Sequence, residues 1–485
     1  MAYNHRIDTE EMATRLTVPV QGTSALQVVV GTCPINMAED PGAVTNVPII
    51  TYSFTEAQKL LGYSDDFKQY TLCQSMDVSY RVFSVAPVIF INVLDAVKHK
   101  KVFSKEGISV KDRKASIMEA GVFLNNLELK AGTDTPLAAG VDYIAEFNTS
   151  GGIDITLLTS EKTADITLLS ASGEQLDPSK VTKEDIIGGY DAATGKETGL
   201  EVIRQVYPKL NLVPGLILAP GWSQDPEVAA VIAAKTRGIN GVFHCEAAID
   251  MDTSKAKVYT ALREAKEAAG IINEHVILLW PKVRLGTKVY CFSAVWAAMT
   301  AYTDARNNNI PMKSPSNELL NMGAAVLDDG TEVLLDTTQA ELVNSFGVVT
   351  AINDNGWRAW GNNTAAYPGI TDPKDRWISC RRMMSWYRNH FLLTFKEKVD
   401  NPGNYRLIES VVDSENLYLN SLSHSGYIAG GVISFQEDEN PITSILDGNI
   451  IFYTKIAFWV PAEYIKNNIE FDPEILAGAI GGGAA

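Results

Sequence analysis

The segment Val276-Ile-Leu-Leu-Trp280, with the helical pattern from Val289 to Ala305 that follows it, decides the fold class of this sequence. The first stretch is a short apolar run typical of a buried strand, and the second is long enough for a helix. The same succession precedes it, with Val242-Phe-His-Cys245 as a strand and 255–269 as a helix. Strands that alternate with helices are joined by crossovers and lie parallel. The sequence therefore predicts an α/β domain with a mostly parallel sheet.

Toward the N-terminus the α/β pattern continues but is interrupted. Apolar runs predict buried strands at 26–34 and 85–94, and Asp225-Pro226 marks the start of a helix. Between Lys98 and Thr198, short alternating runs separated by glycine turns replace this pattern, which indicates a β-rich insertion. We therefore expect one interrupted α/β core domain, formed by 25–98 and 198–346, and an inserted outer domain, 99–197.

The segment 347–463 is predicted to form an α+β carboxyl-terminal domain. It contains a tryptophan-rich loop at 357–364, a long amphipathic helix around Arg381, and two strands joined at Asp447-Gly448. Trp377, Cys380, Met383, Met384, Tyr387, Phe391 and Phe395 share the apolar face of this helix, and Arg381, Arg382, Arg388 and Lys396 share the neighbouring face. This basic face is either solvated, with arginine stems covering the core, or a contact for an acidic partner.

The two ends, 1–24 and 464–485, are predicted to be extended arms. The first lacks helical periodicity, and the second contains an alternating stretch, 464–471, typical of a short edge strand. One interpretation is that both arms add strands to neighbouring subunits, and the other is that they are disordered tails. The candidate residues for strand addition are Tyr3, Ile7, Tyr464, Ile465, Ile469 and Phe471.

Composition and motifs exclude several functions. A formal charge of -17 argues against nucleic acid as a main partner, and five dispersed cysteines indicate buried thiols rather than a disulfide or zinc framework. No glycine-rich phosphate loop, nucleophile elbow or histidine pair at ligand spacing occurs. We assign no catalytic, cofactor-binding or metal-ligating residue. The N-terminus lacks an apolar signal core and no apolar stretch is long enough to span a membrane, so we expect synthesis in a reducing cytoplasm and no membrane insertion.

Motifs spread over most of the chain resemble those of contractile tail sheath proteins of myovirus-type bacteriophages and related phage-tail-like particles. The matching segments, in order, are Tyr3-Asn-His, Val28-Val-Val-Gly31 with Pro34, Asn46-Val-Pro48, Ser53-Phe-Thr-Glu56, Val213-Pro-Gly-Leu216, Ala219-Pro-Gly-Trp222, Ile249-Asp-Met-Asp252, Trp280-Pro281, Ser314-Pro-Ser-Asn317, Asn344-Ser-Phe-Gly-Val348, Trp360-Gly-Asn-Asn-Thr364, Arg381-Arg382 and Pro461-Ala-Glu463 with Ile465. One departure is Asn363, at a position where the family commonly has arginine.

The resemblance implies a multidomain structural subunit without a cofactor. Such subunits polymerise as stacked hexameric rings around an inner tail tube, in a metastable extended state that contracts and drives the tube through a cell envelope. The implied partners are other copies of the chain, the tail tube protein, and baseplate and tail terminator proteins. The implied location is the virion tail, assembled in the host bacterial cytoplasm. In this family the carboxyl-terminal domain faces the tube, so Arg381, Arg382, Arg388 and Lys396 are the expected tube-facing residues.

Two other functions remain as alternatives. An α/β enzyme could bind a nucleotide or other cofactor near His244, which is predicted to lie at the carboxyl end of a strand. A surface adhesion protein is the second alternative, although it would need an export signal.

Overall fold

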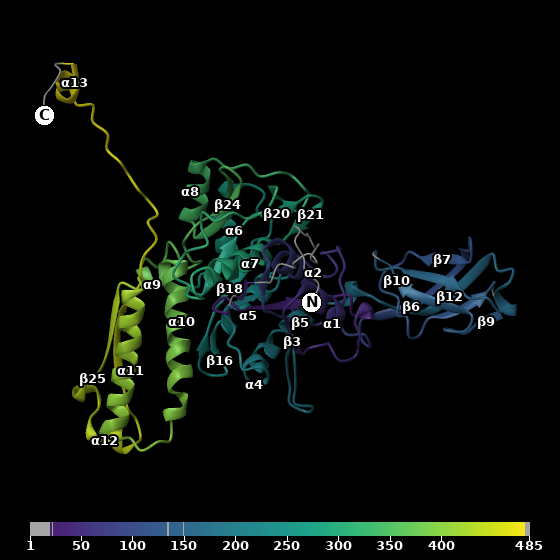
Figure 1. Cartoon of the computed structure of the whole chain (residues 1–485), viewed down its shortest axis with the longest axis horizontal. Helices are drawn as coiled ribbons and strands as arrows, with labels where there is room; N and C mark the ends of the chain where they lie inside the picture. Colours follow the sequence, from purple (N-terminus) through teal and green to yellow (C-terminus); the bar gives the residue numbers. More distant parts are fainter. Residues whose placement is uncertain (1–19, 22, 133–134, 149, 481–485) are drawn as a thin grey trace, which may run out of the picture.

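The computed structural model describes residues 20–21, 23–132, 135–148 and 150–480. Figure 1 shows a central α/β body, a β-rich part that projects from one side of it, and a helical part on the opposite side. A single extended segment leaves the helical part and ends in a short helix far from the rest of the chain.

An eight-stranded sheet forms the centre of the body. In spatial order its strands are β24 (Trp357–Trp360), β23 (Val348–Asn353), β19 (Val276–Leu279), β18 (Glu246–Asp250), β15 (Leu216–Leu218), β2 (Gln27–Gly31), β5 (Val88–Asn92) and β3 (Pro48–Thr51). The six inner strands are parallel, and the two edge strands are antiparallel to their neighbours. The expected mostly parallel sheet is therefore confirmed. Every residue of β2, β5 and β18 is buried, as in a sheet covered on both faces.

The helices that pack around this sheet are α1 (Phe54–Leu61), α2 (Leu72–Asp77), α5 (Pro226–Lys235), α6 (Leu262–Ala269), α7 (Phe292–Ala305) and α8 (Thr337–Ser345). The central one, α7, contacts β2, β15 and β18. It is almost entirely buried because small and apolar residues surround its axis. Its expected start at Val289 is wrong, since Lys288–Tyr290 forms strand β21.

Two further elements are shifted from their expected positions. The strand expected at 242–245 is divided between β17 (Phe243–His244), which pairs with β16 (Arg237–Ile239), and β18 of the main sheet. The helix expected at 255–269 contains α-helix only from Leu262. The strand is divided because the segment 242–249 crosses from a surface hairpin into the main sheet, and periodicity does not mark the crossing.

The expected division at residue 346 falls inside the sheet. Strands β23 and β24 were expected in the carboxyl-terminal domain, with 357–364 as a loop, yet β23 pairs with β19 and β24 with β23. Smaller sheets complete the body: β1 (Val20–Gln21) with β4 (Val85–Ala86), and β21 with β20 (Lys282–Leu285) and β22 (Ala324–Val326).

The projecting part is built from strands with alternating burial. One sheet contains β6 (Lys100–Ser109), β12 (Leu168–Leu176), β8 (Glu128–Ala131) and β9 (Thr135–Leu137), and another contains β10 (Tyr143–Phe147), β11 (Ile153–Leu157) and β7 (Lys114–Ile117). Their inward side chains form a hydrophobic cluster separate from that of the body. Residues after this part return to the body, because Val181 and Ile186, the latter in α3 (Lys183–Ile187), belong to the main cluster. The hairpin of β13 (Gly189–Asp191) and β14 (Lys196–Thr198) follows.

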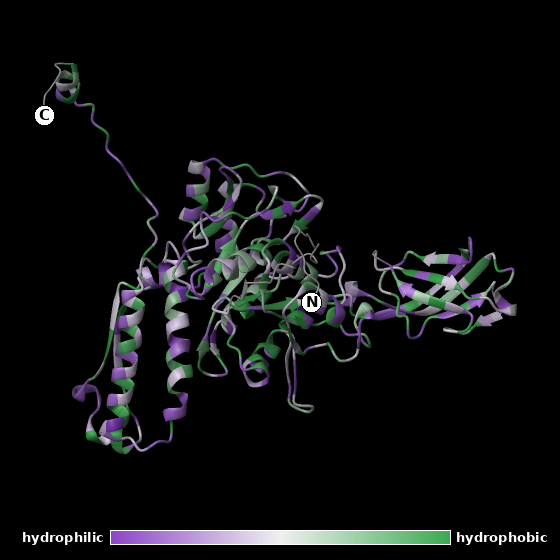
Figure 2. Cartoon of the chain, in the orientation of Figure 1, coloured by the Kyte–Doolittle hydropathy of each residue, from purple (hydrophilic) through white to green (hydrophobic). Residues whose placement is uncertain are grey.

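The helical part, which we call the C-terminal module, contains a third hydrophobic cluster. Its elements are α10 (Ile378–Phe395), α11 (Tyr405–His424), α12 (Ile442–Leu446) and an antiparallel pair, β25 (Gly430–Phe435) and β26 (Phe452–Ala457); α9 (Pro373–Arg376) precedes α10. The chain then continues as the C-terminal arm, residues 464–480, which ends in α13 (Pro473–Ile480). Figure 2 shows hydrophobic and hydrophilic residues alternating along α10 and α11. Within the described residues, no helix combines the length and apolarity needed to span a membrane.

Candidate functional site

The polar face of α10 lies against the α/β body of the same subunit. Ser385 donates a hydrogen bond of 2.6 Å to the buried carboxylate of Glu246, and Lys396 donates to the hydroxyl of Tyr207 at 2.8 Å. Asn389 brackets the backbone of His244, accepting from its N–H at 3.0 Å and donating to its carbonyl at 2.6 Å. This face is therefore the junction between the C-terminal module and the body.

Two of the four expected tube-facing residues are buried in ion pairs. Arg382, whose side chain is 2% exposed, makes a two-pronged ion pair with Asp304 at the end of α7, which is 1% exposed. Arg381 pairs with Asp375 at 2.9 Å. The expected continuous basic surface is therefore wrong, although Arg388 and Lys396 are exposed. Helical periodicity identifies which residues share a face but cannot show that an acidic residue about 80 positions away covers that face.

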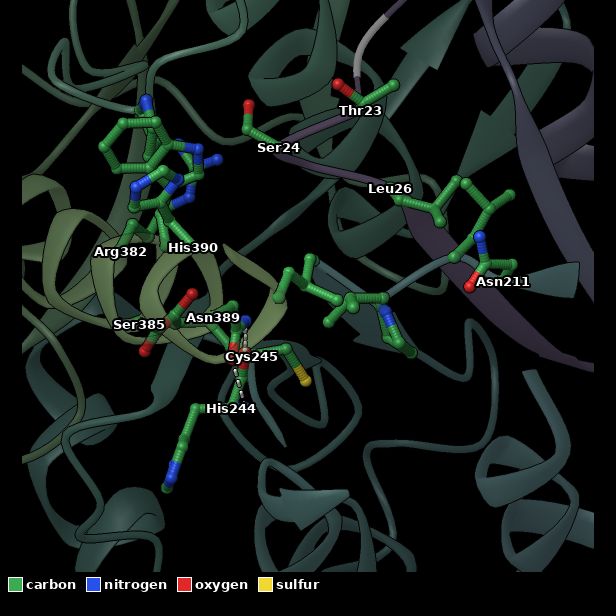
Figure 3. A pocket seen from close by; sticks show the side chains of 18 residues that line it. Thr23, Ser24, Leu26, Asn211, His244, Cys245, Arg382, Ser385, Asn389 and His390 are labelled. Atoms are coloured by element: carbon green, nitrogen blue, oxygen red, sulfur yellow. Dashed lines mark hydrogen bonds between the residues drawn. The ribbon is translucent and has the colours of Figure 1, made fainter. Parts of the chain in front are cut away.

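A cavity of about 310 Å³ opens at this junction (Figure 3). Its walls come from four parts of the chain: the segment leading into β2, the start of β18, α10, and residues 211–215 ahead of β15; Pro311 completes the lining. The labelled residues of Figure 3 include Thr23 and Ser24 from the first part, His244 and Cys245 from the second, and Arg382, Ser385, Asn389 and His390 from the third.

His244 does not have the position or the chemistry expected for an active-site base. It precedes β18, so it lies at the amino end of the parallel strands rather than at the carboxyl end. Burial and the charge of Arg388 lower the pKa of His244 to about 4, which leaves it a weak base at neutral pH. Burial alone would raise the pKa of Glu246, but hydrogen bonds from His275 and Ser385 and the charge of Arg382 bring it below its ordinary value.

Side chains of the subunit itself pack at the carboxyl ends of two parallel strands, β18 and β2. At the end of β18, Asp250 accepts hydrogen bonds from the backbone N–H of Ser293 at 2.8 Å and from its hydroxyl. At the end of β2, a side chain on Gly31 would collide with Thr71, since an added Cβ would lie 2.3 Å from its hydroxyl oxygen. These side chains fill part of the crevice where α/β sheets commonly bind ligands, and a cavity of about 300 Å³ remains beside the end of β18, lined in part by Asp250, Met251 and Lys255.

The apolar face of α10 packs against the rest of the C-terminal module, as expected. Met383, Tyr387, Phe391 and Phe395 contribute to the same cluster as Val411 and Leu419 of α11. All five cysteines are buried free thiols, which confirms that expectation.

The expected strand-adding residues of the C-terminal arm make no strand within the subunit. Residues 458–472 have no regular structure, and Tyr464, Ile465, Ile469 and Phe471 are between 77% and 87% exposed. Among the described residues, no sheet edge pairs with them, so the predicted strand does not form inside one subunit. Of the N-terminal candidates, Tyr3 and Ile7 lie outside the described residues. The described end of that arm is held by its own subunit, because β1 pairs with β4.

Sequence reasoning missed the residues that organise this junction. Four separate segments contribute these residues, which are Ser24, Glu246, Asp304 and Asn389, and each residue makes its polar contact over a long sequence separation. The one available signal was a polar residue inside an otherwise apolar pattern, such as Asp304 at the end of α7.

Comparisons with known proteins agree on one family. No protein-family model matches the sequence. The tail sheath protein of Burkholderia phage BcepMu is 25% identical over 99% of this chain and 99% of its own length. The tail sheath protein of Escherichia phage P2 is 24% identical over 66% of this chain and 76% of its own.

Two solved structures share the fold at 14% identity. One is a chain of the anti-feeding prophage baseplate, with a TM-score of 0.59, covering 97% of this chain and 100% of that chain. The other is a chain of the PVC extracellular contractile injection system sheath in its contracted state, with a TM-score of 0.56, covering 98% and 99%. The full-length match to a phage tail sheath protein and the order of the shared motifs support a contractile tail sheath protein, and the solved structures show the shared fold.

Proposed function

We propose that this structural subunit polymerises as stacked hexameric rings around an inner tail tube and contracts to drive the tube through a cell envelope. The observation that carries the proposal is the pairing of an exposed apolar arm with an unpaired strand edge in the same subunit. We place the finished assembly in the virion tail, formed in the host bacterial cytoplasm, with baseplate and tail terminator proteins at its ends.

The β25–β26 pair is the proposed acceptor for a strand from a neighbour. A two-stranded pair has two edges and is marginally stable alone. The outer edge of β25 is covered at its centre, because Asn416 of α11 accepts from the backbone N–H of Ile433 at 3.0 Å and donates to its carbonyl at 2.9 Å. Among the described residues, none pairs with the outer edge of β26.

The register of the pair identifies the free backbone groups. Ile433 lies opposite Thr454, and its N–H and C=O are turned toward Asn416. Antiparallel partners at such a position both turn their backbone groups away from the shared ladder, so Thr454 turns its groups toward the outer edge of β26. An added strand would therefore bond at Phe452, Thr454 and Ile456.

The C-terminal arm of a neighbouring copy is the proposed donor. Its alternating residues Ile465, Ile469 and Phe471 gain burial by extending the apolar face of the acceptor pair, where Phe452 and Ile456 already pack. At a net ~1 kcal/mol per hydrogen bond, about four bonds give a few kcal/mol per link. This is too little for an isolated pair but sufficient when each subunit has several neighbours. Tyr3 and Ile7 of the N-terminal arm are proposed to add a second strand.

The C-terminal module is proposed to face the tube, as in the resembling family. Arg388 and Lys396 are the members of the expected basic set that are exposed to solvent, so they are the proposed tube contacts. Exposed pairs of this kind contribute ~0–1 kcal/mol each and are screened by salt. Attachment to the tube would then depend on repetition around the rings.

Arm substitutions test the proposal. The double variant Ile465→Asp/Ile469→Asp should fold normally, since both side chains are exposed within the subunit, yet fail to form tubes. The matched control is Asn468→Asp, which adds a charge on the opposite side of the alternating stretch and should assemble. Negative-stain microscopy and circular dichroism supply the two measurements. Normal tubes from the double variant would refute the connector role of the arm.

A further inference from the structure

We propose that Asp304 ties the root of the N-terminal arm to α10, so that the arm and the C-terminal module are mechanically coupled within one subunit. The functional meaning of this coupling rests on the connector role proposed above. The coupling itself is a property of the single subunit.

One buried carboxylate holds both elements. The hydroxyl of Ser24 donates to Asp304 Oδ2 at 2.6 Å, and the guanidinium of Arg382 donates to Oδ1 at 3.1 Å and also to Oδ2. Because Asp304 is almost completely buried, its charge cannot be satisfied by solvent, and both contacts are needed to stabilise it.

The backbone around Asp304 makes a second connection to the arm root. The carbonyl of Asp304 accepts from the N–H groups of Asn307 at 2.8 Å and Asn309 at 2.9 Å. The side chain of Asn309 in turn accepts from the backbone N–H of Thr23 at 3.1 Å. The arm is thus fixed at two successive residues, immediately before the chain enters the central strand β2.

From Arg382 the contacts continue to the proposed acceptor strands. The next residue of α10, Met383, is buried in the cluster that holds Leu419 of α11 and Ile433 of β25. Hydrogen bonds from the arm to Asp304 and α10, followed by a shared hydrophobic cluster, therefore connect the arm to the pair β25–β26. Such a contiguous network can transmit a displacement, and coupling measurements are the way to establish that it does.

This arrangement gives the arm a role beyond tethering. When a neighbouring subunit pulls on the arm, the load is shared between β1, which pairs with β4, and Ser24, through which it acts on Asp304, the charge partner of Arg382, and on β2. The subunit that is pulled would adjust its own acceptor strands, which hold the arm of another neighbour. Successive rings could then respond in sequence without any consumed nucleotide.

Hydrogen–deuterium exchange of the full-length, unassembled subunit tests the coupling. Ser24→Ala removes one hydroxyl and should speed exchange in the first turns of α10, residues 379–386, by about fivefold or more, the lower end of ordinary coupling between two sites. The matched control is Thr23→Ala, which keeps the backbone N–H that bonds Asn309 and should leave α10 unchanged.

Coupling is reciprocal, so a change in α10 should reach the arm root. Arg382→Lys keeps the charge but loses the two-pronged geometry, and it should speed exchange at residues 23–26. The proposal would be overturned if Ser24→Ala speeds hydrogen–deuterium exchange only at residues 23–26. It would also be overturned if Arg382→Lys speeds exchange only in α10. Because the subunit is unassembled in this experiment, such a result would leave the strand-adding role of the arms standing, and a failure of that role would leave the coupling measurable.

Discussion

Charge reversal at two arginines of α10, Arg382 and Arg388, should destabilise the subunit by very different amounts, although both residues were expected on one basic face. Arg382→Glu places a second carboxylate against Asp304, whereas Arg388→Glu changes an exposed residue on the same helix. Breaking a buried ion pair by removing one partner costs about 3–5 kcal/mol, because the remaining charge stays buried. Arg382→Glu should lower the free energy of unfolding by at least that much, and a typical domain has a total stability of only about 5–15 kcal/mol.

The Arg388→Glu variant should lose less than ~1 kcal/mol. Burial and the charges of Arg381 and Arg237 lower the pKa of Arg388, so replacing its positive charge also removes a repulsion. Urea unfolding of the unassembled subunit, followed by tryptophan fluorescence and circular dichroism, compares the two variants directly. Equal unfolding free energies for Arg382→Glu and Arg388→Glu would refute the assignment of Arg382 to a buried ion pair.

Two further predictions concern pH and the projecting part. The pKa of His244 is lowered from 6.5 to about 4, so the unfolded chain binds a proton at this residue more readily than the folded chain does. The free energy of unfolding therefore decreases as pH falls from about 6.5 to about 4. The lowered pKa of Glu246 acts in the same direction. Between pH 6.5 and about pH 4 the free energy of unfolding should fall less for His244→Gln than for the wild type. Equal decreases in the two proteins would contradict the prediction. Replacing residues 101–175 by a short Gly/Ser bridge should preserve tube assembly, because the backbone N–H of Asp177 already bonds the carbonyl of His99 at 2.8 Å; a folded variant that forms no tubes by electron microscopy would argue against a peripheral position for this part.

The elements with strong local signals could be predicted from the sequence. Apolar runs located β2, β5 and β19, and the proline after Asp225 marked the start of α5, where the Asp225 side chain accepts from the N–H of Glu227. The motif order also identified the family, because several short segments in sequence carry more information than any single one. Local chemistry was sufficient in these cases because neighbouring residues determine each element.

The junction could not be predicted, because its geometry depends on distant partners. Arg382 and Arg388 have the same chemistry and share a helix face, yet Asp304 of α7 covers only the first. Asn389 and Asn416 likewise close strand edges by contacts that no helical pattern marks. The domain boundary expected at residue 346 failed for a related reason, since β23 and β24 join a sheet whose other strands precede them by tens to hundreds of residues.

Electron cryomicroscopy of the purified full-length protein tests the central claim most directly. We predict cylindrical helical assemblies in which residues 465–471 of one subunit form a strand along the outer edge of β26 in another. Monomers at all concentrations, or assemblies in which β26 keeps a free edge and the C-terminal arm contacts no neighbour, would contradict this account.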